Sequence, residues 1–524
     1  MKLSLLDTSI VIVYLIAIFA LAQFVSREKA GHVKTAEDYF LAGKALPWWA
    51  VGASLIAANI SAEQIIGMSG SGYAIGLAIA SYEWMAAFTL LVVGKFFLPI
   101  FLRHGIDTMP QFLEQRYGPR IRTLMAVFWL GLYVFVNLTS ILWLGAIAVS
   151  QVTGMEQMSA LAMIAVFALI YQLYGGLKAV ALTDIVQVTL LVIGGVVLSF
   201  VMLNRISGDE GMVAGFMHLW REHPEHFKMI LSPDNPFYKD LPGLGVLLGG
   251  MWIMHISYWG FNQYIIQRAL AAKDIHEAQK GIVFAAFLKL LMPLVVVLPG
   301  IAALSLAPGL ERPDQAYPTM LALLPTGLLG LVFAALVAAI VASLASKINS
   351  IATIFTLDLY AKFTPAQATG NEQHLVRVGR IAAVFAVLIA ALSARPLLGS
   401  FDQAFQYIQE YTGFFTPGIV VIFLLGLFWK RANEAGALAG ALGSFVLSIV
   451  FKLAMPQVPF INRVGIVFLL TLGLAVAVSL LRKSPDADQR LSHAQGVSFA
   501  TTGAFNLAAG GVVAVLIAFY TIFW

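Results

Sequence analysis

The chain contains no cysteine among its 524 residues. This absence excludes a disulfide framework, thiol catalysis and a cysteine-based metal site. Charge is also scarce, because Asp, Glu, Lys and Arg make up 11% of the residues, whereas a soluble domain carries about 25%. With 60% hydrophobic residues, a water-soluble globule of this length would lack the polar residues to cover its surface. The composition therefore predicts a polytopic membrane protein, and it gives no reason to expect a nucleic-acid partner.

Apolar runs long enough to cross the bilayer recur along the whole chain. A span needs about 20 residues to cross about 30 Å of hydrocarbon. We predict an all-α membrane protein with about 14 transmembrane helices, near residues 7–26, 48–70, 76–102, 121–150, 157–175, 179–203, 243–267, 277–306, 326–361, 376–397, 401–429, 434–455, 462–482 and 503–524.

Lys and Arg set the predicted orientation. With the N-terminus outside, the short inner loops hold about twenty basic residues and the short outer segments about five, which is a strong positive-inside bias. We therefore expect both termini outside, in the inner (plasma) membrane. The loop 204–242 is long and charged, and its segment "GMVAGFMHLWREHPEHF" predicts a surface amphipathic helix on the outer side.

Two predicted spans contain polar and helix-weakening residues. The first reads "SLIAANISAEQIIGMSGSGYAIG" (54–76) and the second "GGMWIMHISYWGFNQYIIQ" (249–267). Unwound backbone is tolerated at membrane depth only where it lines a cavity or is buried in protein, and paired helix breaks mark transporter binding sites. The breaks are five spans apart, and this odd offset predicts a five-plus-five inverted repeat. We expect an extra helix and inner loop in 1–47, repeats in 48–203 and 243–429, the outer loop in 204–242, and three further helices in 430–524.

Seven charged residues fall within or near predicted spans. Each costs about 2.5–3.5 kcal/mol at a helix centre on insertion scales, so each is a functional hypothesis. Asp358 is expected to reach the inner face. Glu83 and Lys289 lie deeper and form either a structural ion pair or, as we favour, a hydrogen-bonding site for a polar solute. The full set is Glu63, Glu83, Asp184, Lys289, Lys347, Asp358 and Glu410.

Long motifs between about residues 35 and 480 resemble the sodium:solute symporter family, its sodium/glucose cotransporters, and among these the bacterial sodium/galactose symporters. The motifs that carry the resemblance are "EDYFLAGKALPWWAVGASLIAANISAEQIIGMSGSGYAIGLAIASYEWM", "YWGFNQYIIQRALAAK", "EAQKGIVFAAFLKL", "SFDQAFQYIQEYTG" and "GLFWKRANEAGALAG".

The resemblance implies a site for a sugar. Gln64, Glu83, Lys289 and Gln409 match sugar-binding positions, and His255 stands where relatives have asparagine. Met68, Tyr82 and Phe405 match an apolar outer lid, while Tyr258 matches an inner gate that stacks on the sugar, with Asn59 as its hydrogen-bond partner. These side chains suit a hexose independently of the resemblance, because they donate to and accept from hydroxyls while an aromatic face covers the ring.

The resemblance also implies a sodium site. Ala57, Ile60 and Ala339 match backbone-carbonyl ligands, Ser343 matches a hydroxyl ligand, and Asp184 matches a carboxylate near the site. Sodium is a hard cation that takes oxygen ligands. Two departures bear on coupling: Ala342 lacks a serine hydroxyl that relatives have, and Lys347 follows Ser343 by one helical turn. A third departure, Ala86, removes a hydroxyl one turn after Glu83.

The sequence therefore predicts a carrier rather than an enzyme, since it shows no nucleophile–base pair and no metal-ligand set. We expect import of a galactose-like or glucose-like monosaccharide, coupled to sodium by alternating access. The first alternative is a sodium-independent or proton-linked sugar carrier in which Lys347 acts as a tethered cation. In the competing interpretation, the Lys347 side chain extends along a water-filled inner cavity and sodium dependence remains. A symporter for another polyhydroxylated solute and a channel are further alternatives.

Overall fold

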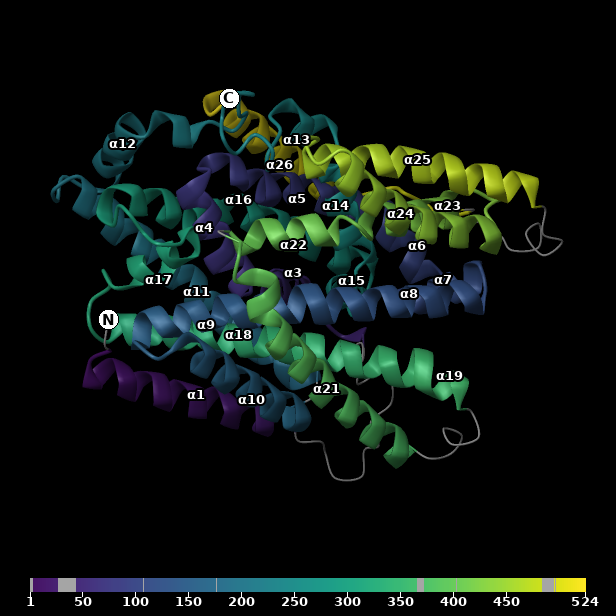
Figure 1. Ribbon diagram of the computed structural model, residues 1–524, viewed down its shortest axis with the longest axis horizontal. Coiled ribbons are helices and arrows are strands. Elements are labelled where there is room, and N and C mark those ends of the chain that lie inside the picture. Colours follow the sequence, from purple (N-terminus) through teal and green to yellow (C-terminus); the bar gives the residue numbers. More distant parts are fainter. Residues whose placement is uncertain are drawn as a thin grey trace.

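A computed structural model describes residues 3–26, 44–106, 108–175, 177–364, 372–401, 403–482, 494 and 496–524. The side chains of residues 22, 23, 25, 26, 173–175, 177–182, 184, 372 and 373 lie outside this description. The described residues form helices and no strands (Figure 1).

The first half of the chain contains these elements: α1 (Leu5–Ser26), α3 (Trp48–Asn59), η2 (Glu63–Gly67), α4 (Met68–Ala74), η3 (Leu77–Ala80), α5 (Ser81–Val92), η4 (Val93–Phe97), α6 (Leu98–Arg103), α7 (Met109–Arg116), α8 (Pro119–Gly131), η5 (Leu132–Leu138), α9 (Thr139–Thr153), α10 (Gln157–Gly175), α11 (Leu177–Ile206), α12 (Met212–Glu222) and η6 (Pro224–Phe227).

The second half contains α13 (Leu244–Leu248), α14 (Met251–Ile256), η7 (Ser257–Phe261), α15 (Gln263–Leu270), α16 (Ile275–Leu306), η8 (Pro313–Gln315), α17 (Ala316–Leu321), α18 (Leu328–Thr353), η9 (Ile354–Tyr360), α19 (Ala361–Phe363), α21 (Glu372–Leu398), α22 (Ala404–Thr412), α23 (Thr416–Phe428), α24 (Glu434–Ala454), α25 (Phe460–Leu481) and α26 (Gly503–Ile522).

Membrane-spanning length is reached by 9 described helices, or by up to 11 when each of two bent pairs counts as one span. The other three predicted spans coincide with the shorter α1 and α10 and with the interrupted run α14–η7–α15. The all-α membrane architecture is confirmed. The count of 14, the inverted repeat and the domain boundaries stay predictions.

The first predicted helix break is confirmed at Ile60. Helix α3 ends at Asn59, Ile60 is extended (φ −71°, ψ 111°), and the chain resumes as the π-helical turn η2. The segments Trp48–Asn59 and Glu63–Ala74 are bent by 66°. The second predicted break lies at Asn262, which is extended (φ −84°, ψ 121°) between η7 and α15. A further bend of 43° between α22 and α23 was not predicted.

Helix α16 packs against both halves of the first broken helix and against α5. Asp274 begins α16, because its side chain accepts a hydrogen bond from the Glu277 N–H (2.9 Å) and so caps a free donor of the first turn. Gly300 allows a close approach farther along, since a Cβ there would lie 2.0 Å from the Ser69 carbonyl oxygen of α4. The solute-facing half of the broken helix is thus held directly on α16.

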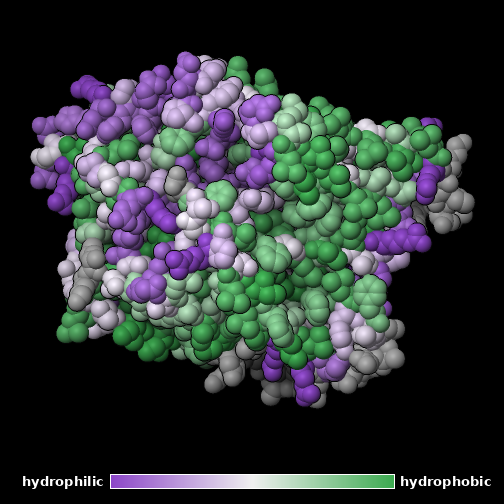
Figure 2. Space-filling model, viewed as in Figure 1, coloured by the Kyte–Doolittle hydropathy of each residue, from purple (hydrophilic) through white to green (hydrophobic). Residues whose placement is uncertain are grey.

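Both termini lie toward the end of the molecule that carries α12, away from the end that carries α7 and α19 (Figure 1). Apolar side chains cover much of the face in Figure 2, while hydrophilic ones gather over the α12 end. Helix α12 confirms the helix predicted in the loop 204–242: Leu219 is buried, whereas Arg221 and Glu222 are exposed.

Two of the predicted membrane charges form ion pairs with residues that are not among the predicted solute-site residues. Asp358 does not reach the surface: it is buried, and its Oδ1 accepts from Arg122 Nε at 2.7 Å. The expectation that the Asp358 side chain reaches the inner face was wrong, because Arg122 of α8, which is far away in sequence, pairs with it inside the protein. Glu410 pairs with Arg463 (Nη2–Oε1, 2.7 Å) and Lys452 (Nζ–Oε1, 3.2 Å).

The contact at Gly300 predicts a stability effect. Gly300→Ala should lower the free energy of unfolding by about 1–3 kcal/mol, because the methyl group must push α4 away from α16. Thermal unfolding of the detergent-solubilised protein measures this loss. Gly131→Ala is the matched control, since a Cβ at Gly131 meets no atom within 4 Å. An equal loss in both variants would contradict the packing argument.

Candidate functional site: a polar cavity at the broken helix

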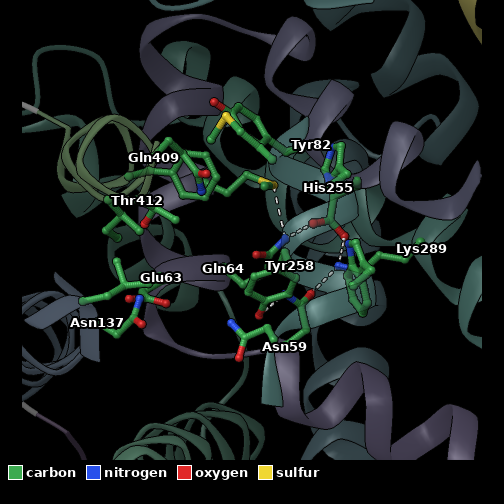
Figure 3. A pocket seen from close by; sticks show the side chains of 18 residues that line it. Asn59, Glu63, Gln64, Tyr82, Asn137, His255, Tyr258, Lys289, Gln409 and Thr412 are labelled. Atoms are coloured by element: carbon green, nitrogen blue, oxygen red, sulfur yellow. Dashed lines mark hydrogen bonds and ion pairs between the residues drawn. The ribbon is translucent and has the colours of Figure 1, made fainter. Parts of the chain in front are cut away.

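A cavity of about 100 Å³ lies beside the first helix break. All ten predicted solute-binding and gate residues line it (Figure 3). The helices that contribute them are far apart in sequence, and the full lining is Asn59, Glu63, Gln64, Met68, Tyr82, Glu83, Leu132, Asn137, Met254, His255, Tyr258, Trp259, Asn262, Lys289, Phe405, Ile408, Gln409 and Thr412.

A buried ion pair forms the charged centre of the cavity. Lys289 Nζ on α16 lies 2.7 Å from Glu83 Oε2 on α5, and the two side chains are 1% and 2% exposed. Gln64 Nε2 donates to the other oxygen of Glu83, and Lys289 also donates to Asn59 Oδ1. The ammonium group lies 5.1 Å from the centre of the Trp259 ring, within the range of a cation–π interaction.

The hydrogen bonds around this pair offset the cost of burying it. Each buried ion carries a desolvation penalty of several kcal/mol, and an ion pair compensates for it only when further hydrogen bonds satisfy the remaining groups. Gln64 and Asn59 make those bonds, and they flank the break in the helix. The two interpretations of Glu83 and Lys289 are thus compatible: they form an ion pair, and that pair faces the cavity.

An aromatic side chain closes one side of the cavity. The Tyr258 hydroxyl accepts from Asn59 Nδ2 at 3.1 Å and from the Tyr264 hydroxyl at 2.7 Å. The predicted Asn59–Tyr258 hydrogen bond is therefore present. Tyr133 donates to Asn262 Oδ1 at 3.0 Å, which anchors the second helix break to η5. Tyr258 is thus held at both of the interrupted helices.

The predicted outer lid is an aromatic cluster. The rings of Tyr82 and Phe405 meet edge to face with their centres 5.0 Å apart. The centre of the Tyr82 ring also lies 6.2 Å from the centre of the His255 ring. Met68 Sδ lies 3.6 Å from Gln64 Nε2, so the lid touches the charged centre. Among the described residues, His255 Nε2 has no hydrogen-bond partner. A buried polar atom without a partner beside a cavity is available to a polar ligand.

The predicted sodium ligands lie at the end of α3 and on α18, and the predicted nearby carboxylate lies on α11. Ala57 and Ile60 stand at the end of α3, where the last carbonyl groups of a helix have no partner inside it. Ala339, Ala342 and Ser343 lie on α18. Asp184 lies in α11, but its side chain is outside the described residues.

Lys347 connects α18, which holds predicted sodium ligands, to η2, the segment that follows the helix break. Its Nζ lies 3.9 Å from Glu63 Oε2 on η2, and its side chain is 2% exposed. The expectation that the Lys347 side chain extends along a water-filled cavity was wrong, because that side chain is buried and pairs with Glu63, whereas continued sodium dependence stays a prediction. The tethered-cation alternative for Lys347 stays a prediction.

Sequence reasoning did not assign Glu63, Asn137, Asn262 or Thr412 to the site, yet all four line the cavity. Figure 3 shows Asn137 beside Glu63. The available signal was weak: Asn137 is a single amide within the apolar run "VFVNLTS", and Glu63 was recognised only as a membrane-depth charge.

Comparisons with known proteins agree on the family. Residues 39–443 match the sequence model of the sodium:solute symporter family. A sodium/glucose cotransporter of Vibrio parahaemolyticus is 50% identical, over 100% of this chain and 99% of its own. Sodium/myo-inositol cotransporter 2 of Mus musculus is 35% identical, over 85% of this chain and 69% of its own.

Two solved structures share the fold. One is a sodium-coupled sialic acid symporter in a substrate-bound, outward-open state, with a TM-score of 0.77 at 23% identity, covering 91% of this chain and 98% of the other. The second is a transporter of the nucleobase-cation-symport-1 family in a closed conformation, with a TM-score of 0.55 at 15% identity, covering 87% and 100%.

The buried pair predicts a non-additive pair of substitutions. Lys289→Met should lower the free energy of unfolding by about 3–5 kcal/mol, because it leaves the Glu83 carboxylate buried without its cation. Adding Glu83→Gln should recover most of that loss, since no uncompensated charge then remains. Thermal unfolding without added solute measures both variants. Additive losses in the double variant would show that Glu83 and Lys289 are not coupled.

Proposed function

The chain belongs to the sodium:solute symporter family, and from this premise we propose that it imports a monosaccharide through the polar cavity, driven by sodium. The relative from Vibrio parahaemolyticus, named a sodium/glucose cotransporter, matches this chain over its full length and supports a hexose as solute. A galactose-like or glucose-like sugar is the proposed cargo, and sodium is the proposed coupling ion.

The observation that carries the proposal is the chemistry of the cavity. Glu83 accepts hydrogen bonds, Lys289 donates them, and Gln64, Gln409 and Asn59 can do both. A hexose presents several hydroxyls that need such partners, and the Tyr258 ring can cover its apolar face. A solute without these hydroxyls would leave buried polar groups unpaired, so the cavity is selective for polyhydroxylated molecules.

The interrupted helix supplies the proposed coupling between ion and sugar. Ala57 and Ile60 would bind sodium through carbonyl groups, together with the Ala339 carbonyl and the Ser343 hydroxyl of α18, with Asp184 nearby. Asn59 lies between the two carbonyl ligands, and Gln64 follows one helical turn after Ile60. A sodium ion that fixes this backbone would also fix two solute ligands, and binding of one would raise the affinity for the other.

Alternating access would use the two layers of aromatic residues. Met68, Tyr82 and Phe405 would cover the sugar from the outer side, and Tyr258 would close the inner side. The proposed location is the inner membrane with both termini outside, which follows from the distribution of Lys and Arg. The two termini share one end of the molecule, which supports placing them on the same side (Figure 1).

A second candidate solute is a cyclic polyol. The mouse relative is named for myo-inositol, and a ring of hydroxyls would meet the same donors and acceptors. His255, which departs from the pattern of the bacterial sodium/galactose symporters, lines the cavity and could shift this choice, whereas Ala86 is not among the lining residues. Under the tethered-cation alternative Lys347 replaces sodium, and wild-type uptake would ignore sodium.

Uptake in proteoliposomes tests the proposal. Radiolabelled galactose or glucose should accumulate when an inward sodium gradient is imposed and fall to near background when choline replaces sodium. Gln64→Ala should reduce uptake by roughly 10-fold or more, because it removes a hydrogen bond to a charged group. Unlabelled myo-inositol is the competing solute. Sodium-stimulated uptake of myo-inositol but not of hexose would reassign the substrate, and uptake indifferent to sodium would favour the tethered cation.

Substitutions of Tyr258 separate stacking from hydrogen bonding. Tyr258→Phe keeps the ring and removes the hydroxyl that Asn59 and Tyr264 contact, so transport should fall moderately, by about 3–10-fold. Tyr258→Ala should be far worse, since the ring itself is lost. Initial uptake rates, normalised to the amount of reconstituted protein, provide the comparison. Equal defects in the two variants would show that stacking is not the role of this residue.

A further inference from the structure

The Glu63–Lys347 ion pair has no role in the proposed binding of sugar or sodium, although Glu63 lines the central cavity. Lys347 Nζ lies 3.9 Å from Glu63 Oε2 and 4.9 Å from the centre of the Tyr264 ring. The Lys347 side chain is buried, and Glu63 is 14% exposed. Such a pair is weak evidence for stability, because desolvation cancels much of the attraction. Its position in the molecule gives a better explanation.

A second polar cavity lies next to Lys347. Its volume is about 160 Å³, and its wall includes the Tyr264 ring. Neutral amides and hydroxyls make up much of the remaining wall: Gln263, Gln267, Ser346, Asn349, Ser350 and Thr353. The wall also includes Arg122 and Asp358 of the ion pair between α8 and η9. The residues of α18 that line it fall in the half of that helix predicted to face the cytoplasm.

Two contacts join the residues of the central cavity to those of the second cavity. Tyr264, which lines the second cavity, donates its hydroxyl to Tyr258, which lines the central one. Lys347, next in sequence to Ser346 of the second cavity, reaches Glu63 of the central one. A third contact links the two, because the Lys347 ammonium also lies over the Tyr264 ring.

We propose that the Glu63–Lys347 pair is a latch that closes the inner side of the central cavity by holding α18 to the broken helix. The latch rests on the proposed alternating-access function. Like the proposed sodium site, the latch joins the broken helix to α18. On the broken helix, Glu63 follows Ile60 by about one turn, and on α18, Lys347 follows Ser343 by about one turn. Sodium and the latch therefore hold the same closure together.

The surroundings let such a latch open. In the closed state the two charges attract each other at low dielectric. When α18 and η2 separate, polar groups of both cavities and water entering from the cytoplasmic side can solvate the ammonium and the carboxylate. The open state then avoids two uncompensated buried charges, so the pair favours closure without preventing opening. Removing the lysine should leave sodium alone to hold the inner side shut.

The absence of cysteine makes this testable by thiol labelling, since a single introduced cysteine accounts for the whole signal. Thr412→Cys places a reporter in the central cavity, on α22, which is neither of the two elements that the latch joins. A membrane-impermeant maleimide is added to inside-out vesicles that contain sodium. With the latch intact, labelling should be slow. With Lys347→Met it should be faster by about tenfold, and Glu63→Gln should have the same effect.

Two controls make the result specific. Lys280→Met removes an exposed lysine that pairs with Glu277 at 3.4 Å on the surface, and it should leave the labelling rate unchanged. The charge exchange Glu63→Lys with Lys347→Glu should restore slow labelling, because it rebuilds the pair. Unchanged labelling in both Lys347→Met and Glu63→Gln would overturn the latch. Fast labelling of the charge-exchange variant would also overturn it, provided that this variant elutes as a folded protein. Labelling needs no sugar, so a failed assignment of the solute would not imitate either result.

Discussion

The extended backbone at Ile60 is the constraint on which the rest of the structure depends. It ends α3 inside the bilayer and tilts the following segment by 66°. Hydrocarbon cannot satisfy the carbonyl groups that this break frees, so they must face protein, water or a cation. The break also turns Asn59 and Gln64 toward the Glu83–Lys289 pair. One local departure from helical geometry thereby sets both the proposed ion ligands and the charged centre of the cavity.

Buried charge then connects the broken helix to its neighbours. On one side, Glu83 of α5 and Lys289 of α16 bind it through Gln64 and Asn59. Glu63 binds it through Lys347 to α18. Neither pair is needed to build a core, because apolar packing against α16 already holds α4 in place. Two separate polar connections suit a helix that has to hold one position firmly and still release it, which is what alternating access requires of this element.

Much of the site was predictable from the sequence, because the hydrocarbon of the bilayer makes buried polar residues costly and therefore rare. A chain with 11% charged residues makes each polar residue at membrane depth informative, so the runs around Asn59 and His255 could be identified as helix breaks. The resemblance to a family added the outer lid and Gln409, and the cavity contains all of these residues. The partner of Asp358 and the partner of Lys347 could not be predicted, because Arg122 and Glu63 are more than two hundred residues away in sequence. Helical periodicity carries no information about such contacts. The bend between α22 and α23 was missed although a local signal exists, because Pro417 stands in the first turn of α23.

The central claim is that one interrupted helix makes sugar and sodium binding interdependent. Equilibrium binding of radiolabelled galactose to the purified protein, titrated at several sodium concentrations with choline as the balancing cation, tests it directly. The account predicts that saturating sodium raises the affinity for galactose by about 5–150-fold, and that galactose raises the affinity for sodium by the same factor. Galactose affinity that is identical with and without sodium would contradict the account.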